Sequence, residues 1–181
     1  MEARELKTLK QIAEHFNRPA HRIIHLCESG VILPTVDAKG RGTMRRFSRD
    51  DTFRILVALE LQEAGVQVPL IKPLMQAFDR LLEIRAIKKL KADRQPSDLV
   101  EVIRHHLGAA DQPVIAFLTP PDRVALVTPR FSVPSGPDVR VDLHMSDRHL
   151  LTRGVSIVIN LTHDADYIAN TLWQTRATQP S

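Results

Sequence analysis

Seven basic or imidazole side chains near the amino terminus have the types and spacing needed to bind nucleic acid. Three fall within five consecutive positions on one predicted helix, and the other four lie in or beside a short glycine-containing segment. Arginine, lysine and histidine donate hydrogen bonds to phosphate oxygens, and from a helix in the major groove they also reach base edges. The predicted contact residues are His21, Arg22, His25, Lys39, Arg41, Arg45 and Arg46. Double-stranded DNA is therefore the expected partner.

Charge is distributed unevenly along the chain. Residues 1–91 hold 17 Lys and Arg against 11 Asp and Glu, a net charge of +6, whereas residues 92–181 carry −2. A basic half joined to a mildly acidic half is typical of a polyanion-binding unit attached to a second module. The composition, with 43% hydrophobic and 25% charged residues, excludes a wholly disordered chain.

Two short helices must position the first three contact residues. Thr8 and Gln11 fit a capping box, so we expect the first helix to begin after Thr8. Pro19 is predicted to be the first residue of the second helix and Gly30 to end it, because proline suits a first turn and glycine a C-terminal cap. Neither helix can bury both of its faces alone, so the following segment must pack against the pair.

That segment, residues 31–47, is predicted to form a β-hairpin. It has an apolar stretch, Val31–Leu33, then a basic tip with two glycines, and a second short strand that ends at Phe47. Glycine at the tip lets the backbone approach a phosphate without a side-chain collision. With Ile23 and Leu26 buried, the second helix would present its contact residues outward, and the hairpin would supply the other four.

Two longer helices follow the hairpin. Ser48 with Asp51 is a strong N-cap signature for a helix that ends at Gly65. A proline deep inside a helix costs about 3 kcal/mol, so we expect the next regular helix to begin within a turn of Pro73. Its apolar face would run over Leu74–Leu90.

The order of helix, turn, helix, basic hairpin and capped helix is that of a winged helix-turn-helix. Over residues 6–78 the sequence resembles the MerR family of bacterial transcriptional regulators, through an ordered set of motifs rather than one specific signature. The matching motifs are Leu9–Ala13, Glu28–Ile32, Met44–Asp51 and Leu61–Gly65. The resemblance implies a regulator that binds DNA through this head.

By position, the resemblance also implies that Arg45 binds the DNA backbone and that Phe47 supports the wing. It implies a homodimer formed through a long helix after the head, for which Leu74–Leu90 is the candidate; the alternative is that this face packs on the chain's own carboxyl half. Ile24-His25 stands where the family often has Arg-Tyr, and Met44 where it has an aromatic residue. The operator preference of the family therefore does not carry over.

The predicted fold class is α+β, in three parts. Residues 1–78 form the winged helix-turn-helix domain, residues 79–96 a linking or dimerisation helix and boundary, and residues 97–181 a small α+β module for effector binding or oligomerisation. In this module a helix capped by Ser97 precedes about four antiparallel strands. The expected strands are residues 114–118, 124–127, 139–143 and 155–159, and the closing helix is residues 164–173.

No cofactor and no metal are expected. His21 and His25 have a spacing that suits zinc, but no carboxylate is placed to complete the site, and Cys27 is the single cysteine. The longest apolar stretch, residues 113–118, is far too short for a membrane helix, and the first residues lack a secretion signal, so a cytoplasmic protein is expected. A large aromatic ligand cage is not expected, and a small-molecule effector has no support in the sequence beyond a smaller apolar pocket.

Catalysis is not expected either. The carboxylates of the richest acid–base cluster are explained by the start of a helix, where the helix dipole favours negative charge. The cluster consists of Asp142, His144, Asp147, His149, His163, Asp164 and Asp166.

Two alternatives to a regulator remain open. One is an architectural protein, such as an excisionase-like factor or a phage DNA-packaging recognition protein, although excisionase-like heads usually lack the full helix over residues 48–64. The other is a protein-interaction module without DNA affinity, for which the apolar Ile24 in the second helix is the best argument.

Overall fold

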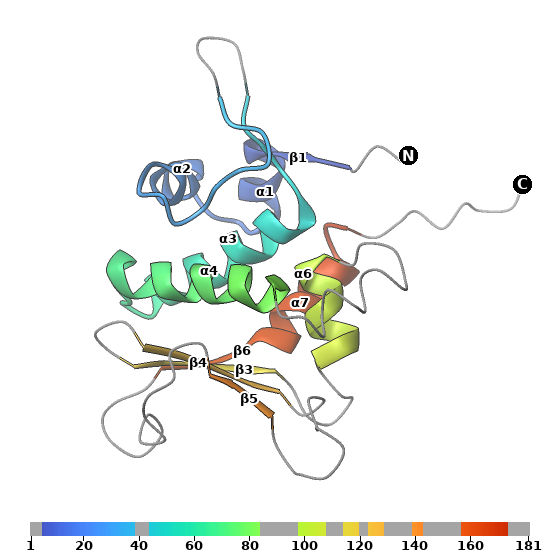
Figure 1. Cartoon of the computed structure of the whole chain (residues 1–181). Coiled ribbons are helices and arrows are strands. Elements are labelled where there is room, and N and C mark those ends of the chain that lie inside the picture. Colours follow the sequence, from blue (N-terminus) through green and yellow to red (C-terminus); the bar gives the residue numbers. More distant parts are fainter. Residues whose placement is uncertain are drawn as a thin grey trace, which may run out of the picture.

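The computed structural model of this protein describes residues 5–38, 44–83, 98–107, 114–119, 123–128, 139–142 and 157–173. Within them the elements, in chain order, are β1 (Lys7–Thr8), α1 (Leu9–His15), α2 (Ala20–Glu28), β2 (Arg46–Phe47), α3 (Arg49–Glu63), α4 (Val68–Glu83), α6 (Leu99–Glu101), the π-helical η1 (Val102–Leu107), β3 (Ile115–Thr119), β4 (Arg123–Thr128), β5 (Val139–Asp142), β6 (Ile157–Asn160) and α7 (Leu161–Asn170). These elements are stacked in layers (Figure 1), with α1, α2 and β1 on one side, α3 and α4 in the middle, and the strands β3 to β6 on the other side.

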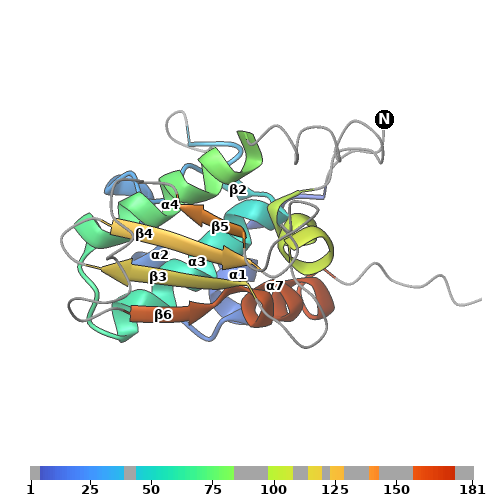
Figure 2. The same cartoon turned by 60° about the horizontal axis from the view of Figure 1, so that its bottom comes forward.

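The described strands of the carboxyl half form an antiparallel sheet in the order β5-β4-β3-β6. Helix α4 packs against this sheet, and Figure 2 shows α7 continuing directly from β6. Both α6 and α7 pack against α3. The helix-turn-helix and the carboxyl sheet are therefore joined through α3 and α4.

The helix-turn-helix forms for local reasons that the sequence reveals. Thr8 Oγ1 accepts a hydrogen bond from the Gln11 N–H, and Gln11 Oε1 accepts one from the Thr8 N–H, which confirms the predicted capping box. Helix α2 begins one residue later than predicted, because Pro19 has an extended backbone and is the N-cap. Gly30, with a φ of +70°, follows the end of α2, a conformation that glycine adopts without strain.

The predicted hairpin strand over Val31–Leu33 is wrong. The N–H groups of Val31 and Ile32 both donate to the Leu26 carbonyl, at 3.0 and 3.1 Å, so this backbone closes the end of α2 instead of joining a sheet. Both side chains are buried. The second predicted strand exists as β2, but it pairs antiparallel with β1, a strand that the sequence did not reveal.

Helix α3 is the central helix of the structure. Ser48 and Asp51 form the predicted capping box at its start, and Gly65, with a φ of +82°, follows its end. The helix is buried on nearly all sides, as expected for a helix enclosed by other elements. Its buried apolar residues are Phe53, Ile55, Val57, Ala58, Leu59 and Leu61.

Helix α4 begins earlier than predicted. It starts at Val68 and contains Pro73, so the expectation that regular helix begins within a turn of this proline is wrong. Pro69 lies in the first turn, whose N–H groups have no acceptor within the helix. The proline therefore costs no helical hydrogen bond at this position. The buried side chains of Ile71 and Leu74, on either side of Pro73, supply packing that offsets the lost hydrogen bond.

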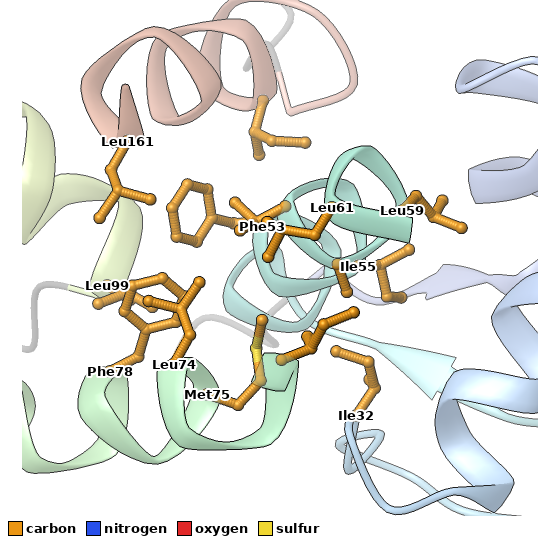
Figure 3. Close-up of a cluster of buried hydrophobic side chains, with 14 of the residues drawn as sticks. Ile32, Phe53, Ile55, Leu59, Leu61, Leu74, Met75, Phe78, Leu99 and Leu161 are labelled. Atoms are coloured by element: carbon orange, nitrogen blue, oxygen red, sulfur yellow. The ribbon is translucent and has the colours of Figure 1, made fainter. Parts of the chain in front are cut away.

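The apolar stripe of α4 does not face solvent. Leu74, Phe78 and Leu81 are each 0% exposed within the single chain. Figure 3 shows Leu74 and Phe78 facing Leu99 of α6, with Phe53 of α3 close by. In its described part the stripe therefore packs on the chain's own carboxyl half, which is the alternative to a dimer face. The rest of the predicted stripe, residues 84–90, lies outside the described residues.

The carboxyl helices begin at caps that differ from the predicted ones. Asp98 caps α6, with its Oδ1 accepting from the Glu101 N–H at 3.0 Å, whereas Ser97 lies outside the described residues. Helix α7 begins at Leu161, with Asn160 as its N-cap, which is three residues before the predicted start. Leu99 and Leu161 belong to the same buried cluster as the core of the helix-turn-helix. The two halves therefore share one hydrophobic core.

Candidate nucleic-acid interface

Helix α2 presents the predicted contact residues on its outer side. Ile23 and Leu26 are 0% exposed, which fixes the buried face of the helix as the sequence predicted. His21 and His25 are exposed on the opposite side, and Arg22 is half-buried between the two faces. The side chains of His21 and His25 can therefore reach a ligand in solution, and so can that of Glu28 near the end of the helix.

Arg22 is held by a carboxylate from another helix. Its Nη1 donates to Glu63 Oε1 at 2.9 Å, and Glu63 is the last residue of α3. Arg18, in the turn before α2, donates from Nη2 to the second oxygen of the same carboxylate at 2.8 Å. The two arginines hold the pKa of the Glu63 carboxyl below its usual range. Glu63 thus ties the turn, through Arg18, and the first part of α2, through Arg22, to α3.

His21, Arg22 and His25 line one open hollow of about 390 Å³. The opposite wall of the hollow is the connection from α3 to α4 and the first residue of α4, Val68. The amino end of a helix carries partial positive charge, so it adds to the attraction for an anion. The hollow therefore has a donor-rich lining that suits a phosphate group.

The described base of the wing is fixed by its own backbone. Val36 and Arg46 exchange two hydrogen bonds, at 3.0 and 2.9 Å between N and O, which form an isolated bridge. Arg46 also pairs with Thr8 of β1. Figure 1 shows this base on the side of the molecule that carries α2, away from the sheet. The wing and α2 can therefore meet the same partner.

Arg45 is the wing arginine with a defined ion pair. Its Nε donates to Asp37 Oδ1 at 3.0 Å, and this contact lowers the pKa of the Asp37 carboxyl. The pair links the two arms of the wing and leaves the other guanidinium N–H groups for a second acceptor. The remaining predicted wing contacts, Lys39 and Arg41, lie outside the described residues.

Three acidic or hydroxyl residues, Thr35, Asp51 and Glu63, position this site, and sequence reasoning missed the roles of Thr35 and Glu63. Asp51 Oδ2 accepts from Thr35 Oγ1 at 2.6 Å and from the Thr35 N–H at 2.9 Å, in addition to closing the capping box of α3. The carboxylate therefore ties the start of the wing to α3. The roles of Thr35 and Glu63 depend on partners 16 and 41 to 45 residues away, so only the folded chain reveals them.

The structure adds nothing that would place a metal at this surface. Burial raises the pKa of the Cys27 thiol to about 11, so the thiolate that binds metals is disfavoured at neutral pH. Within the described ranges, no group of three His, Cys, Asp or Glu side chains is arranged to hold a metal ion.

The acid–base cluster of the carboxyl half is divided by the fold. Asp166 Oδ1 accepts from Arg104 Nε at 2.6 Å, whereas Asp164 is turned into the protein and is 3% exposed. His144, Asp147 and His149 lie outside the described residues. Among the helices that are described, none is long and apolar enough to cross a membrane.

Comparison with known proteins gives one family match, over the amino-terminal head. The family model described as MerR HTH family regulatory protein matches residues 7–77, which include β1 to α3 and most of α4. No curated protein matches the chain. The match covers the elements that carry the described contact residues and ends before the carboxyl helices. Residues 7–77 thus match the MerR family of helix-turn-helix regulatory proteins over less than half of the chain, which supports a DNA-binding regulator in general.

Proposed function

We propose that this protein is a sequence-specific transcriptional regulator whose α2 lies in the major groove and whose wing, residues 37–46, binds phosphates. The observation that carries the proposal is the hollow lined jointly by His21, Arg22 and His25, at the amino end of α4. This surface brings together three donor side chains and the positive end of a helix dipole. Such a combination suits a polyanion better than any other partner.

The dimensions of α2 support this role. An α-helix about 10–12 Å wide fits the major groove of B-DNA, which is about 12 Å wide. Because Ile23 and Leu26 anchor one face of α2 in the core, the opposite face is held rigidly for base contacts. A rigid reading surface loses little conformational entropy on binding.

The contact residues divide into two roles. Arg45 and Arg46 of the wing, together with Lys39 and Arg41, are proposed to bind phosphates, which fixes the register of the protein without selecting a sequence. Arg22 is proposed to reach a base edge or a phosphate while it keeps its bond to Glu63, since a guanidinium has five N–H donors. His21 and His25 complete the α2 surface.

The rest of the chain is proposed to serve this head. Residues 1–78 would bind DNA, residues 79–96 would link and dimerise, and residues 97–181 would bind an effector or assist oligomerisation. Two heads that bind paired half-sites add their contacts, which compensates for the small surface of one head. The described part of α4 is covered by its own chain, so a dimer would need the residues that follow Glu83.

The architectural alternative is less favoured by the helix that follows the wing. An excisionase-like head usually lacks this full helix, whereas α3 has 15 residues and forms the centre of the fold.

The decisive experiment selects bound fragments from random DNA and then measures the affinity for the selected site against salt. If about eight phosphates are neutralised per dimer, log K should fall against log[salt] with a slope near −7. Selection of a palindrome would support a paired reader, and enrichment of bent or phased sites would favour the architectural role. Binding that is insensitive to salt, or absent, would favour a protein-interaction module.

Arg45→Ala is the variant that tests the wing, with Arg80→Ala as a control that removes the same charge near the far end of α4. The wing variant should lose about tenfold affinity for all sequences alike, because a phosphate contact positions without specifying. The control should bind as the wild type does. A loss confined to one base position would contradict the phosphate role of Arg45.

A further inference from the structure

An acidic side chain ends α3, where the helix dipole disfavours negative charge. Glu63 is the last residue of α3, and the last turn of this helix, which the structure describes in full, holds no basic residue. The carboxyl end of a helix carries partial negative charge, so a carboxylate is unfavourable there unless cations lie close by. Two guanidinium groups, those of Arg18 and Arg22, supply this compensation. The position of Glu63 is therefore explained by its contacts with the two arginines, not by the stability of α3 alone.

The first arginine anchors the carboxylate. Arg18 donates from Nη2 to Glu63 Oε2 at 2.8 Å, and its Nε forms an ion pair with Oε1, which is the two-pronged geometry that a guanidinium and a carboxylate prefer. Its Nη1 donates to the carbonyls of Phe16 and Asn17, at 3.3 Å each. All three nitrogens of the Arg18 guanidinium are thus engaged within the protein. Arg18 fixes Glu63 and is not free to bind a ligand.

The second arginine contacts the same carboxylate with one nitrogen. Arg22 Nη1 donates to Glu63 Oε1 at 2.9 Å, and the Arg22 side chain is 27% exposed. Arg22 lines the hollow on the α2 surface, whereas Glu63 and Arg18 do not, so the carboxylate meets the guanidinium from behind the hollow. Within the described residues Arg22 uses only Nη1. Its Nε and Nη2 therefore remain as a pair of donors for a ligand in the hollow.

We propose that Glu63 is a specificity-determining residue, which holds the guanidinium of Arg22 so that Nε and Nη2 meet the edge of a guanine. This inference rests on the proposed DNA binding. Guanine presents two neutral acceptors, O6 and N7, to the major groove, and they suit a bidentate arginine. A phosphate would bring a second negative charge close to Glu63, so the arrangement favours the base over the backbone.

The advantage of a held guanidinium is entropic. An unrestrained arginine side chain has many rotamers and loses this freedom when it binds a base. The guanidinium of Arg22 is already oriented by Glu63, so less freedom is lost on binding. An unrestrained guanidinium would also reach neighbouring acceptors about as well as the correct base. The discrimination between bases at this position therefore depends on the carboxylate.

A pair of substitutions, made singly and together in the full chain, tests the proposal. Fluorescence anisotropy measures the affinity for the selected site and for duplexes with one base pair changed at the position where Arg22→Ala relaxes the preference. Glu63→Ala should lower the discrimination at that position by about tenfold, as Arg22→Ala does. Because Glu63 acts through Arg22, adding Glu63→Ala to Arg22→Ala should lower the discrimination no further.

Asp79→Ala is the matched control, because it removes another carboxylate that holds an arginine across two helices. Asp79 of α4 accepts a hydrogen bond from Arg54 Nη2 of α3 at 2.7 Å, and neither residue lines the hollow. This variant should discriminate between bases as the wild type does. Alanine is the best helix former, so both α3 and α4 should keep their helical structure, and urea unfolding of each variant checks this.

A measurement without DNA separates this inference from the proposed function. In the free wild type, the heteronuclear NOE of the Arg22 Nε–H group should match that of the backbone amides of α2, and in Glu63→Ala it should fall because the side chain becomes mobile. A mobile Arg22 in the wild type, unchanged discrimination in Glu63→Ala, additive losses in the double variant, or no position relaxed by Arg22→Ala would each overturn the inference. A wild type that binds no DNA although Arg22 is rigid would overturn the proposed function, whereas one that selects a site with a mobile Arg22 would overturn this inference alone.

Discussion

Two charged regions meet at the end of α3, and they hold their charges in opposite ways. On the α2 side, the Arg22 side chain is 27% exposed and the neighbouring histidines face solvent. On the α7 side, the Asp164 carboxyl is buried, and a side-chain hydrogen bond joins it to the carboxyl of Glu60. Water stabilises the exposed charges of the α2 side until a polyanion takes its place, whereas the two carboxyls of the α7 side are stabilised by a shared proton.

This difference teaches which solution variable should control each region. Exposed cations that meet phosphates release counterions, so salt should govern the α2 surface. Sheltered carboxyls change their protonation with their surroundings, so pH should govern the joint between α3 and α7. Among the described residues, Glu63 is the carboxylate that both regions share, because it contacts Arg22 and also lines the cavity of about 210 Å³ between α3 and α7.

The two regions belong to one folded body if they unfold together. Phe78→Ala tests this and is the substitution with the largest expected effect on stability. Phe78 is 0% exposed and lies 5.5 Å, ring centroid to ring centroid, from Phe53 in the shared core. Truncation should lower the free energy of unfolding by about 3–5 kcal/mol. Urea unfolding followed by circular dichroism and by the fluorescence of the single tryptophan, Trp173, measures it.

The unfolding transitions reported by the two probes should shift together to lower urea concentration, because the core is continuous between the head and the carboxyl helices. Leu33→Ala, which truncates a side chain that is 77% exposed, is the control and should leave the transition nearly unchanged. Separate transitions for the two probes would show that head and carboxyl helices unfold independently, against the comparison.

The second prediction separates the two arginines that share Glu63. Arg22→Ala removes a proposed DNA contact, so affinity for the selected site should fall by about 1–3 kcal/mol, and preference at one base position should relax if Arg22 reads a guanine. Arg18→Ala removes the other partner of the same carboxylate, outside the hollow. Fluorescence anisotropy with single-base variants of the site measures both. Equal effects of the two substitutions would assign Arg22 a structural role only.

Local features of the fold could be predicted from the sequence, because they depend on neighbouring residues. The capping boxes of α1 and α3 are closed by partners three residues apart, and the buried face of α2 follows from the helical spacing of Ile23 and Leu26. The same rules failed at Val31–Leu33, where an apolar run with strand-like composition closes a helix end instead.

The cavity and the shared carboxylate could not be predicted, since each joins distant parts of the chain. Helical periodicity indicates that one side of α3 is buried but not which element covers it. The sequence accounts for Asp164 by its place near a helix start, where the helix dipole favours negative charge. It does not reveal that Glu60, more than 100 residues earlier, lies against Asp164. Glu63 belongs to the family motif Leu61–Gly65, and the motif does not indicate its contacts with Arg18 and Arg22.

The third prediction concerns pH and the joint between α3 and α7. The folded-state pKa of Glu60 is raised to about 7 from 4.5, so the folded chain binds the proton more tightly than the unfolded chain does. This contribution to stability is complete below pH 4.5 and is lost as the pH rises toward and through 7. Burial raises the pKa of Asp164 as well, and that of Asp50 to about 6, so both add to the decline.

Glu60→Gln isolates the effect of one group from the others. Its stability should depend less on pH between 5 and 8 than that of the wild type, as measured by thermal unfolding in a series of buffers. Glu14→Gln, on the exposed side of α1, is the control and should keep the wild-type slope. The same slope in Glu60→Gln as in the wild type would mean that Glu60 stays ionised and that the joint is not governed by pH.

The smallest expected effect distinguishes positioning of the wing from stability of α3. Thr35→Val removes the 2.6 Å hydrogen bond to Asp51 that ties the wing to α3, and Thr52→Val removes a 2.8 Å bond to the Ser48 carbonyl in the same first turn. Each should cost about 0.5–1.5 kcal/mol of stability. Only Thr35→Val should also weaken DNA binding, by a few-fold, because it loosens the base from which Arg45 reaches a phosphate. If both variants weaken DNA binding equally, the wing is held by its backbone bridge to Arg46 alone, and the Asp51 contact serves only the helix.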